Sequence, residues 1–298
     1  MMRTSEETSQ GGLSSVPVRR SLLFVPGNRP ERFMKALAAG PDVVVIDLED
    51  AVAPAEKEAA RRKALGALAD LAGSAPATEI YLRLNAPRTR AGLDDLAALL
   101  DHRPRLGGIL LPKVEGQGDI ELVDALMDEA GYDTGLAAVI ETISGLDSAY
   151  AIAKASPRMT FLMFGGADLA AELRVAIAWE PLIHARADVV RAAARAGIDA
   201  LDMPFLGLDD PAGHDREIVA AARLGFTGKS AIHPKQIDAI NRYFTPDGEA
   251  VAQARRIVDA STKTAGGVML LDGKLVERPI LLGAHRVLAV AARTGLSA

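Results

Sequence analysis

Two acidic residues in the middle of the chain occupy equivalent places. Glu141 follows the apolar run 136–140, Asp168 follows the apolar run 161–164, and a helix-like segment comes after each of them. If both runs are neighbouring parallel strands of one barrel, the two carboxylates project from the same rim. Such a pair suits a hard divalent cation, which takes oxygen ligands and completes its shell with waters or substrate oxygens. The spacing therefore predicts a metal site at Glu141 and Asp168.

Each of these residues also has a structural interpretation. Asp168 precedes LAAEL and could be a helix N-cap, which stabilises a helix by about 1 kcal/mol. Glu141 stands beside Thr142 and Ser144 and could have the same capping role. Taken singly, capping and metal binding are equally good interpretations. Taken as a pair at equivalent places, the two residues favour metal binding.

Further polar residues stand where other apolar runs end. They are Arg29, Asp47, Glu49, Asp50, Arg83, Asn85, Lys113 and His233. Because side chains alternate along a strand, Asp47 and Glu49 share a face, and Asp50 is a turn candidate. Acidic residues and cations on one rim predict an anionic substrate that is held together with a metal.

Arg83 lies inside the apolar stretch YLRLN, where a buried guanidinium needs an anionic partner. Its planar fork suits a bidentate carboxylate of a substrate, and an internal ion pair with Glu49 is an alternative that can hold at the same time. His233 has no second histidine nearby, so we expect a structural role for it. Lys229 and Lys235 fit either phosphate binding or a solvated surface.

These residues have to be positioned by a repeating pattern of strands and helices. Eight short apolar runs alternate with longer amphipathic segments, which is typical of βα units and a parallel sheet. Eight such units predict a (β/α)₈ TIM barrel, in which active sites lie at the C-terminal ends of the strands. The main alternative, a doubly wound sheet, would usually carry a G-x-G-x-x-G motif after its first strand, and VPGNRPER is not one.

The chain is predicted to have three parts. Residues 1–19 are polar and read as a flexible tail, residues 20–244 form the barrel, and residues 245–298 form a helix–hairpin–helix extension. Asp272-Gly273 is the predicted turn of that hairpin. The extension is either a lid or an arm for packing and oligomerisation.

Composition excludes several classes of function. The formal net charge of −5 gives no support to binding nucleic acid or an anionic membrane surface. The chain has no cysteine, which excludes disulfides, thiolate metal sites and cysteine nucleophiles. No apolar run is long enough to span a bilayer, and the N-terminal segment does not read as a signal peptide. A cytoplasmic protein is the expectation.

Several of these motifs together resemble the HpcH/HpaI aldolase and citrate lyase β-subunit-like family, whose members include citryl-CoA, malyl-CoA and citramalyl-CoA lyases. The resemblance rests on the stretch 19–61, with VPGNRPER and DLEDAV, and on YLRLN, VIETISGL, FGGADLAAEL, GKSAIHPKQI and GGVMLLDGKLVERP in the same order. It spans nearly the whole chain after the tail. One departure is Gly166-Ala167, where relatives often have larger or polar residues, so the shape of the pocket is expected to differ.

The resemblance implies a role for individual residues. Glu141 and Asp168 match the Mg²⁺ ligands, and Arg83 matches the arginine that grips the keto acid. Glu49, the expected ion-pair partner of Arg83, is predicted to be catalytic with it. Phe24, Arg29 and Lys35 match positions near the substrate or CoA. Asp272 matches a catalytic acid/base that is supplied by a neighbouring subunit, and a homo-oligomer, a trimer or a hexamer, is implied.

The implied reaction is cleavage or formation of a carbon–carbon bond in a hydroxyacyl thioester, such as citryl-CoA giving acetyl-CoA and oxaloacetate. The thioester is carried by CoA or an acyl carrier. Malyl-CoA or citramalyl-CoA lyase activity and a thioesterase outcome are alternatives within the same class. A non-catalytic subunit that binds acyl carriers is the alternative of another class.

Overall fold

The structure is a computed structural model that describes residues 18–71, 78–263 and 269–295. The described chain divides into two compact units, one of which is Arg19–Arg242 and the other of which includes the chain from Tyr243 onward. The predicted boundary at residue 244 lies two residues from this division. Most of the predicted tail lies outside the described residues, but Arg19 is buried and forms an ion pair with Glu79.

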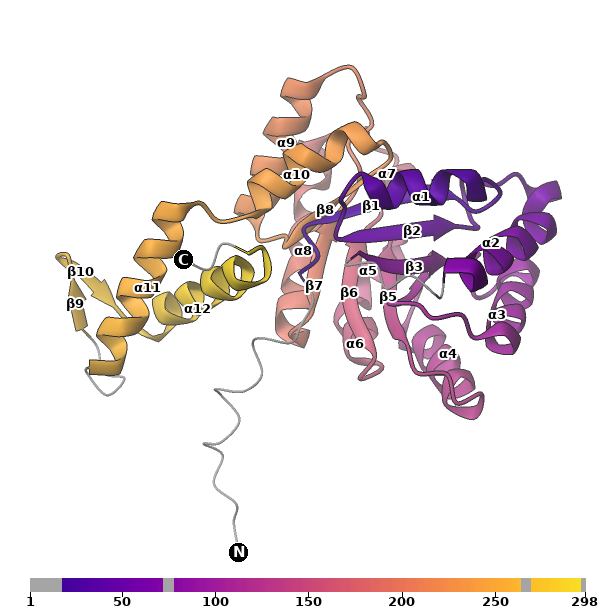
Figure 1. Cartoon of the computed structure of the whole chain (residues 1–298), viewed down its shortest axis with the longest axis horizontal. Helices are drawn as coiled ribbons and strands as arrows, with labels where there is room; N and C mark the ends of the chain where they lie inside the picture. The colour runs from indigo at the N-terminus through magenta and orange to yellow at the C-terminus, as the bar shows by residue number, and fades with distance from the viewer. Residues whose placement is uncertain (1–17, 72–77, 264–268, 296–298) are drawn as a thin grey trace, which may run out of the picture. The chain divides into compact units, whose positions relative to one another are not determined.

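Eight parallel strands close into a barrel in sequence order, with β1 paired to β8 (Figure 1). They are β1 (Ser21–Pro26), β2 (Val43–Asp47), β3 (Glu79–Arg83), β4 (Gly108–Leu111), β5 (Gly135–Ile140), β6 (Met159–Phe164), β7 (Asp199–Asp202) and β8 (Gly228–Ala231). All eight predicted strands are present, and the predicted (β/α)₈ barrel is confirmed.

Helices follow the barrel strands along the chain. They are η1 (Pro30–Arg32), α1 (Phe33–Ala38), η2 (Pro54–Glu56), α2 (Lys57–Leu71), α3 (Arg90–His102), α4 (Gln117–Glu129), α5 (Ile143–Asp147), α6 (Ala149–Lys154), α7 (Gly166–Leu173), α8 (Trp179–Ala196), α9 (Pro211–Leu224), η3 (Pro234–Gln236) and α10 (Ile237–Phe244). Among the described residues, no helix combines the length and the apolar character needed to cross a bilayer.

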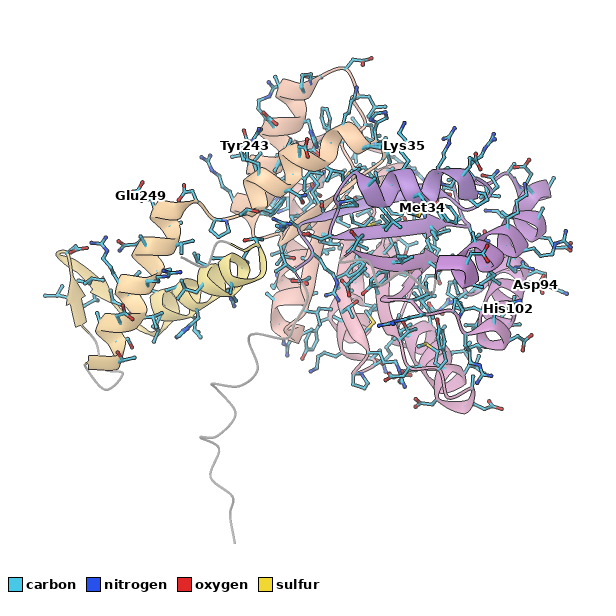
Figure 2. All side chains as sticks on the ribbon, in the orientation of Figure 1. Met34, Lys35, Asp94, His102, Tyr243 and Glu249 are labelled. Atoms are coloured by element: carbon cyan, nitrogen blue, oxygen red, sulfur yellow. The ribbon has the colours of Figure 1, made fainter. Side chains whose placement is uncertain are left out.

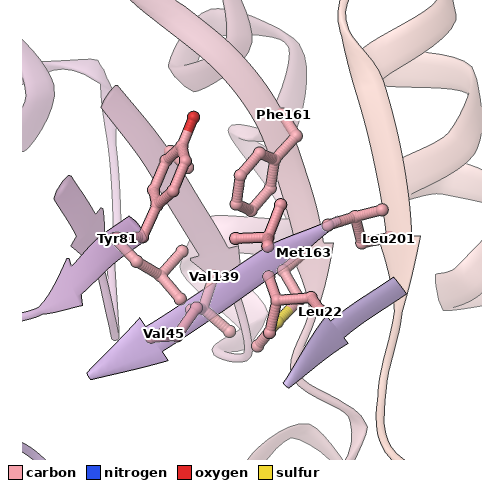
Figure 3. Packing of buried hydrophobic residues seen from close by; sticks show 10 residues of the cluster. Leu22, Val45, Tyr81, Val139, Phe161, Met163 and Leu201 are labelled. Carbon is pink, nitrogen blue, oxygen red and sulfur yellow. The ribbon is translucent and has the colours of Figure 1, made fainter. Parts of the chain in front are cut away.

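The interior of the barrel is filled by alternate residues of its strands (Figure 3). The buried cluster consists of Leu22, Val43, Val45, Tyr81, Leu110, Ala137, Val139, Phe161, Met163 and Leu201. Where a strand contributes two of these residues, as β2, β5 and β6 do, they are spaced by two, because strand side chains alternate between the inside and the outside of a barrel. The same spacing continues to Asp47, Arg83 and Glu141. The inward rows of β2, β3 and β5 therefore change from apolar to charged at the C-terminal rim.

The described residues of the C-terminal unit form two helices and a hairpin. These elements are α11 (Gly248–Lys263), β9 (Met269–Leu271), β10 (Lys274–Val276) and α12 (Arg278–Arg293), with β9 and β10 antiparallel. A small core containing Ala254, Ile257, Val276 and Ala284 holds the unit together. The predicted helix–hairpin–helix extension is confirmed, with its turn at Asp272-Gly273.

Candidate active site

A cavity of about 340 Å³ opens where the charged residues end the inward rows of the barrel. Four carboxylates line it, those of Asp47, Asp50, Glu141 and Asp168, together with the guanidinium of Arg83. Its other walls are largely apolar and consist of Phe24, Ala51, Met163, Phe164, Gly165, Gly166, Ala167, Met203, Pro204, Leu206 and Ile232. The sequence-predicted Phe24, Arg83, Glu141 and Asp168 therefore meet in one cavity.

Arg83 is held by two buried carboxylates. Its Nε and Nη2 donate to Asp47 Oδ1 and Oδ2, both at 2.7 Å, and its Nη1 lies 2.9 Å from Glu49 Oε2. The guanidinium carbon lies 4.9 Å from the centre of the Phe24 ring, a cation–π distance. Burial alone would lower the pKa of Arg83, but the hydrogen bonds and charges of Asp47 and Glu49 outweigh it and raise this pKa.

The partner Asp47 was not predicted, although the predicted ion pair with Glu49 is present. Asp47 and Arg83 are aligned across β2 and β3. The backbone N–H groups of Glu49 and Ala51 also donate to Asp47, at 2.8 and 3.2 Å. Asp47 thereby fixes both the loop after β2 and the plane of the Arg83 guanidinium.

Replacing Arg83 with methionine is expected to destabilise the protein by about 3–5 kcal/mol, because it leaves the buried Asp47 and Glu49 carboxylates without their cation. Urea unfolding measures this loss. Arg88→Met is the matched control, since Arg88 also has two carboxylate partners, Glu115 and Asp119, but its side chain is 56% exposed. A loss for Arg83→Met no larger than for Arg88→Met would contradict the expectation.

Glu141 is buried at the end of β5. Its Oε1 accepts a hydrogen bond of 2.8 Å from the backbone N–H of Lys113. Gly165 makes room for it, since a Cβ at that position would lie 2.3 Å from Glu141 Cβ and 2.6 Å from Oε2. Burial, followed by the charge of Glu49, raises the pKa of Glu141 to about 8. This environment favours the protonated, neutral form of Glu141.

This raised pKa predicts how the stability of the metal-free protein depends on pH. An ordinary glutamate titrates near 4.5, so between about 4.5 and 8 the folded chain binds a proton that the unfolded chain has lost. The free energy of unfolding is therefore expected to fall as pH rises through this range and to level off above it. Urea unfolding of the metal-free protein across pH measures the slope, and Glu141→Gln should reduce it. An identical slope in this variant would contradict the assignment to Glu141.

Asp168 is the third residue of α7. The N-cap of α7 is Gly165, and the N-cap of α5 is Thr142, whose side chain accepts from Gly145 N. The capping interpretations of Asp168 and Glu141 are therefore wrong. Asp168 Oδ2 is buried and lies 2.9 Å from Lys113 Nζ, but outside hydrogen-bond geometry.

Glu141 and Asp168 suit a small divalent cation such as Mg²⁺. Both supply carboxylate oxygens at one cavity, and the buried Oδ2 of Asp168 faces the ammonium of Lys113, outside hydrogen-bond geometry. The described residues contain no group of three or more histidine, aspartate or glutamate side chains disposed around one metal position. Two carboxylates are nevertheless enough for Mg²⁺, which usually keeps waters and substrate oxygens as its other ligands.

Lys113 links the acidic residues of this site, a role that sequence reasoning missed. Its Nζ donates to Glu49 Oε1 at 2.6 Å and lies 3.9 Å from Asp50 Oδ1, besides its contact with Asp168. The sequence marked Lys113 only as a residue that ends a strand.

The predicted residues Glu49, Arg29 and Lys35 are not among those that line the cavity. Glu49 is buried against Arg83 and Lys113, and burial is the main cause that raises its pKa. Arg29, the residue before η1, is exposed. Lys35, within α1, is also exposed, as Figure 2 shows.

Asp272 belongs to the C-terminal unit and is described within that unit alone. It lies at the turn between β9 and β10, and its Oδ2 is 3.0 Å from Arg256 Nη1 of α11. Both Asp272 and Gly273 have positive φ angles, 51° and 74°.

Neither sequence interpretation of Lys229 was right. Its side chain is fully buried, and its Nζ donates to Asp202 Oδ2, Glu217 Oε1 and the carbonyl of Met203, each at 2.7 Å. His233 has the expected structural role, because its Nδ1 accepts from Lys235 N and caps η3. Lys235 fits the solvated-surface interpretation.

Comparisons with known proteins identify the family of this chain. The model of the HpcH/HpaI aldolase/citrate lyase family matches residues 20–234, and that of the C–C bond lyases of the TIM-barrel fold matches residues 186–295. Citrate lyase subunit beta of Leuconostoc mesenteroides subsp. cremoris is 32% identical, over 92% of this chain and 93% of its own length. L-malyl-CoA/beta-methylmalyl-CoA lyase of Rhodobacter capsulatus is 34% identical, over 87% and 90%.

A solved structure agrees with these relatives. Protein CitE of Mycobacterium tuberculosis, in complex with magnesium, acetoacetate and coenzyme A, is 32% identical with a TM-score of 0.76, over 92% of this chain and 98% of that one. The sequence resemblance is thereby confirmed, and the chain belongs to the HpcH/HpaI aldolase/citrate lyase family.

Proposed function

We propose that this protein is a Mg²⁺-dependent carbon–carbon lyase that cleaves, or forms, a hydroxyacyl thioester, giving an acetyl thioester and a 2-keto acid. The observation that carries the proposal is the meeting of Arg83, Glu141 and Asp168 in one cavity at the C-terminal rim of the barrel. The family supports it, since its relatives include a citrate lyase subunit and a malyl-CoA lyase. The bound magnesium and coenzyme A of the CitE structure support the cofactor and the carrier.

Glu141 and Asp168 would hold the metal. When bound, Mg²⁺ acts as a Lewis acid on the oxygens of the keto-acid half of the substrate. Arg83 would hold the carboxylate of that half and offset the negative charge at this end. Asp47 and Glu49 keep the guanidinium in place, so Glu49 would act through Arg83.

Cleavage involves two proton transfers and one electron pair. The substrate hydroxyl loses its proton to solvent and becomes the carbonyl of the keto acid, while the electrons of the broken bond pass to the acetyl thioester as an enolate. A general acid then protonates the enolate carbon, and Asp272 would supply that proton. In the direction of synthesis the same carboxylate would be the base.

The β1–α1 segment would receive the thioester. Phe24 lines the cavity beneath Arg83, whereas the exposed cations Arg29 and Lys35 would attract the phosphates of CoA or of a protein-bound carrier. We also propose that the protein is a homo-oligomer, a trimer or a hexamer, and that it is cytoplasmic.

The lining of the cavity favours one group of keto acids. Among its described lining residues Arg83 is the one cation, and Met163, Phe164, Met203 and Leu206 form an apolar wall. A carboxylate on the keto-acid side chain would be desolvated against this wall without a partner, which is costly. We therefore favour malyl-CoA or citramalyl-CoA, whose keto acids carry a hydrogen or a methyl group, over citryl-CoA.

Steady-state assays of all three thioesters, with Mg²⁺ and with EDTA, test this function. We expect Mg²⁺-dependent release of acetyl-CoA and keto acid, with kcat/KM about tenfold or more higher for malyl-CoA or citramalyl-CoA than for citryl-CoA, since an unpaired buried charge costs more than about 1.4 kcal/mol. Free CoA released in place of acetyl-CoA would indicate a thioesterase. An equal or higher kcat/KM for citryl-CoA would contradict the preference, and no metal-dependent cleavage of any thioester would indicate a non-catalytic carrier-binding subunit.

A further inference from the structure

We propose that the ammonium of Lys113 is a resident counter-cation that competes with Mg²⁺ for Asp168 and so lowers the affinity of the site for the metal. This inference rests on the proposed function, because it takes Glu141 and Asp168 as the metal pair. It assigns Lys113 as a positioning residue, which acts through the carboxylates it contacts.

The ammonium is surrounded by carboxylates. It lies 2.6 Å from Glu49 Oε1, 2.9 Å from Asp168 Oδ2 and 3.9 Å from Asp50 Oδ1. A metal cation bound at this place would have carboxylate oxygens around it in the same way. Asp168 Oδ2 is buried and outside hydrogen-bond geometry, and the ammonium is a positive charge that lies against this oxygen.

The backbone of Lys113 serves the other member of the pair. Its N–H donates to Glu141 Oε1, and its φ angle of 51° is in the left-handed region, which is unfavourable for a residue with a side chain. Strained backbone of this kind persists where the surrounding structure imposes it, and it clusters at functional sites. One residue thus contacts Glu141 through its backbone and Asp168 through its side chain.

The direction of the effect follows from electrostatics. A positive charge beside a ligating oxygen repels an approaching Mg²⁺ and makes that oxygen a weaker donor. Removing the ammonium also removes a contact that stabilises the metal-free site. Both effects favour the protein with Mg²⁺ bound, so loss of the Lys113 charge should tighten metal binding. In the loaded protein we expect the ammonium to remain on Glu49.

Titration calorimetry with Mg²⁺ alone tests the inference on the full-length protein. Lys113→Met removes the charge and keeps the length of the side chain, whereas Lys113→Gly removes the charge and suits the positive φ angle. Lys113→Arg keeps the charge.

Lys57→Met is the matched control. The Nζ of Lys57 donates to the carbonyls of Leu48 and Glu49, so it lies beside the same acidic residues without an ion pair to Asp168. If the effect were only the net charge of the neighbourhood, this variant would change the affinity as much as Lys113→Met. Circular dichroism confirms that each variant is folded.

We expect Lys113→Met and Lys113→Gly to bind Mg²⁺ about tenfold more tightly than the unmodified protein, the scale of coupling between close charges. Lys113→Arg and Lys57→Met should change the dissociation constant by less than about threefold. Unchanged or weaker binding in both uncharged Lys113 variants would overturn the inference, as would equal tightening in Lys57→Met. If the unmodified protein and every variant bound no Mg²⁺, the metal site of the proposed function would be wrong. If Mg²⁺ bound with the same affinity to the unmodified protein and to the uncharged Lys113 variants, only the inference about Lys113 would be wrong.

Discussion

Replacing Asp168 with asparagine is expected to abolish detectable Mg²⁺ binding and to lower kcat/KM by about 10³-fold or more, since stabilising the charge on the developing carbonyl oxygen usually contributes more to such catalysis than any other effect. Asparagine keeps the shape of the side chain but loses the charge that a divalent cation needs. Asp168 caps no helix and its side chain is 43% exposed, so folding should be unaffected. Titration calorimetry and steady-state kinetics measure the two losses, and thermal melting of the metal-free variant checks the fold.

Glu172→Gln is the control for Asp168→Asn, because Glu172 lies on the same helix and does not line the cavity. Its Oε2 accepts from the backbone N–H of Ile143 at 2.7 Å, a contact that glutamine can keep. We expect turnover within about threefold of the unmodified protein, as for a surface substitution of small energetic effect. If Asp168→Asn bound Mg²⁺ with unchanged affinity, Asp168 would not be a metal ligand.

The barrel and part of its site could be predicted because both depend on local periodicity. A spacing of two along β2, β3 and β5 places the apolar interior residues and then continues to Asp47, Arg83 and Glu141. Eight such strands in sequence order are enough to bring their ends to one rim. Asp168 was found for the same reason, since it follows the strand next to that of Glu141.

The partners of these residues could not be predicted in the same way. Lys113 contacts Glu49, which is 64 positions away in sequence, and its contact with Glu141 needs a left-handed backbone that no residue type in LPKVE signals. Lysine is usually a surface residue, yet Lys229 lies in the interior, where Asp202 and Glu217 neutralise its charge. Burial of a charge depends on which carboxylates the fold brings to it, and one sequence does not show this.

Replacing Asp272 with asparagine is expected to lower turnover by about 10²–10⁴-fold in both directions, the usual contribution of a general acid or base. The substitution is well suited to the site. Asp272 and Gly273 both have positive φ angles, as a type I′ hairpin turn requires, and Asn-Gly is a preferred sequence for that turn. The hairpin should therefore keep its structure while losing the carboxylate, and Mg²⁺ affinity should not change.

The ion pair of Asp272 provides the control, and a mixture of variants tests whether the residue acts from a neighbouring subunit. Arg256→Gln removes the partner 3.0 Å away and keeps the carboxylate, so it should retain most of the turnover, because both side chains are more than half exposed.

Asp272→Asn and Asp168→Asn, each inactive alone, should regain activity when they are co-expressed, since a mixed oligomer can join an intact hairpin to an intact metal pair. A mixture without activity would mean that Asp272 acts within its own chain. Full turnover of Asp272→Asn alone would remove Asp272 from the mechanism, and the enolate would then take its proton from another group.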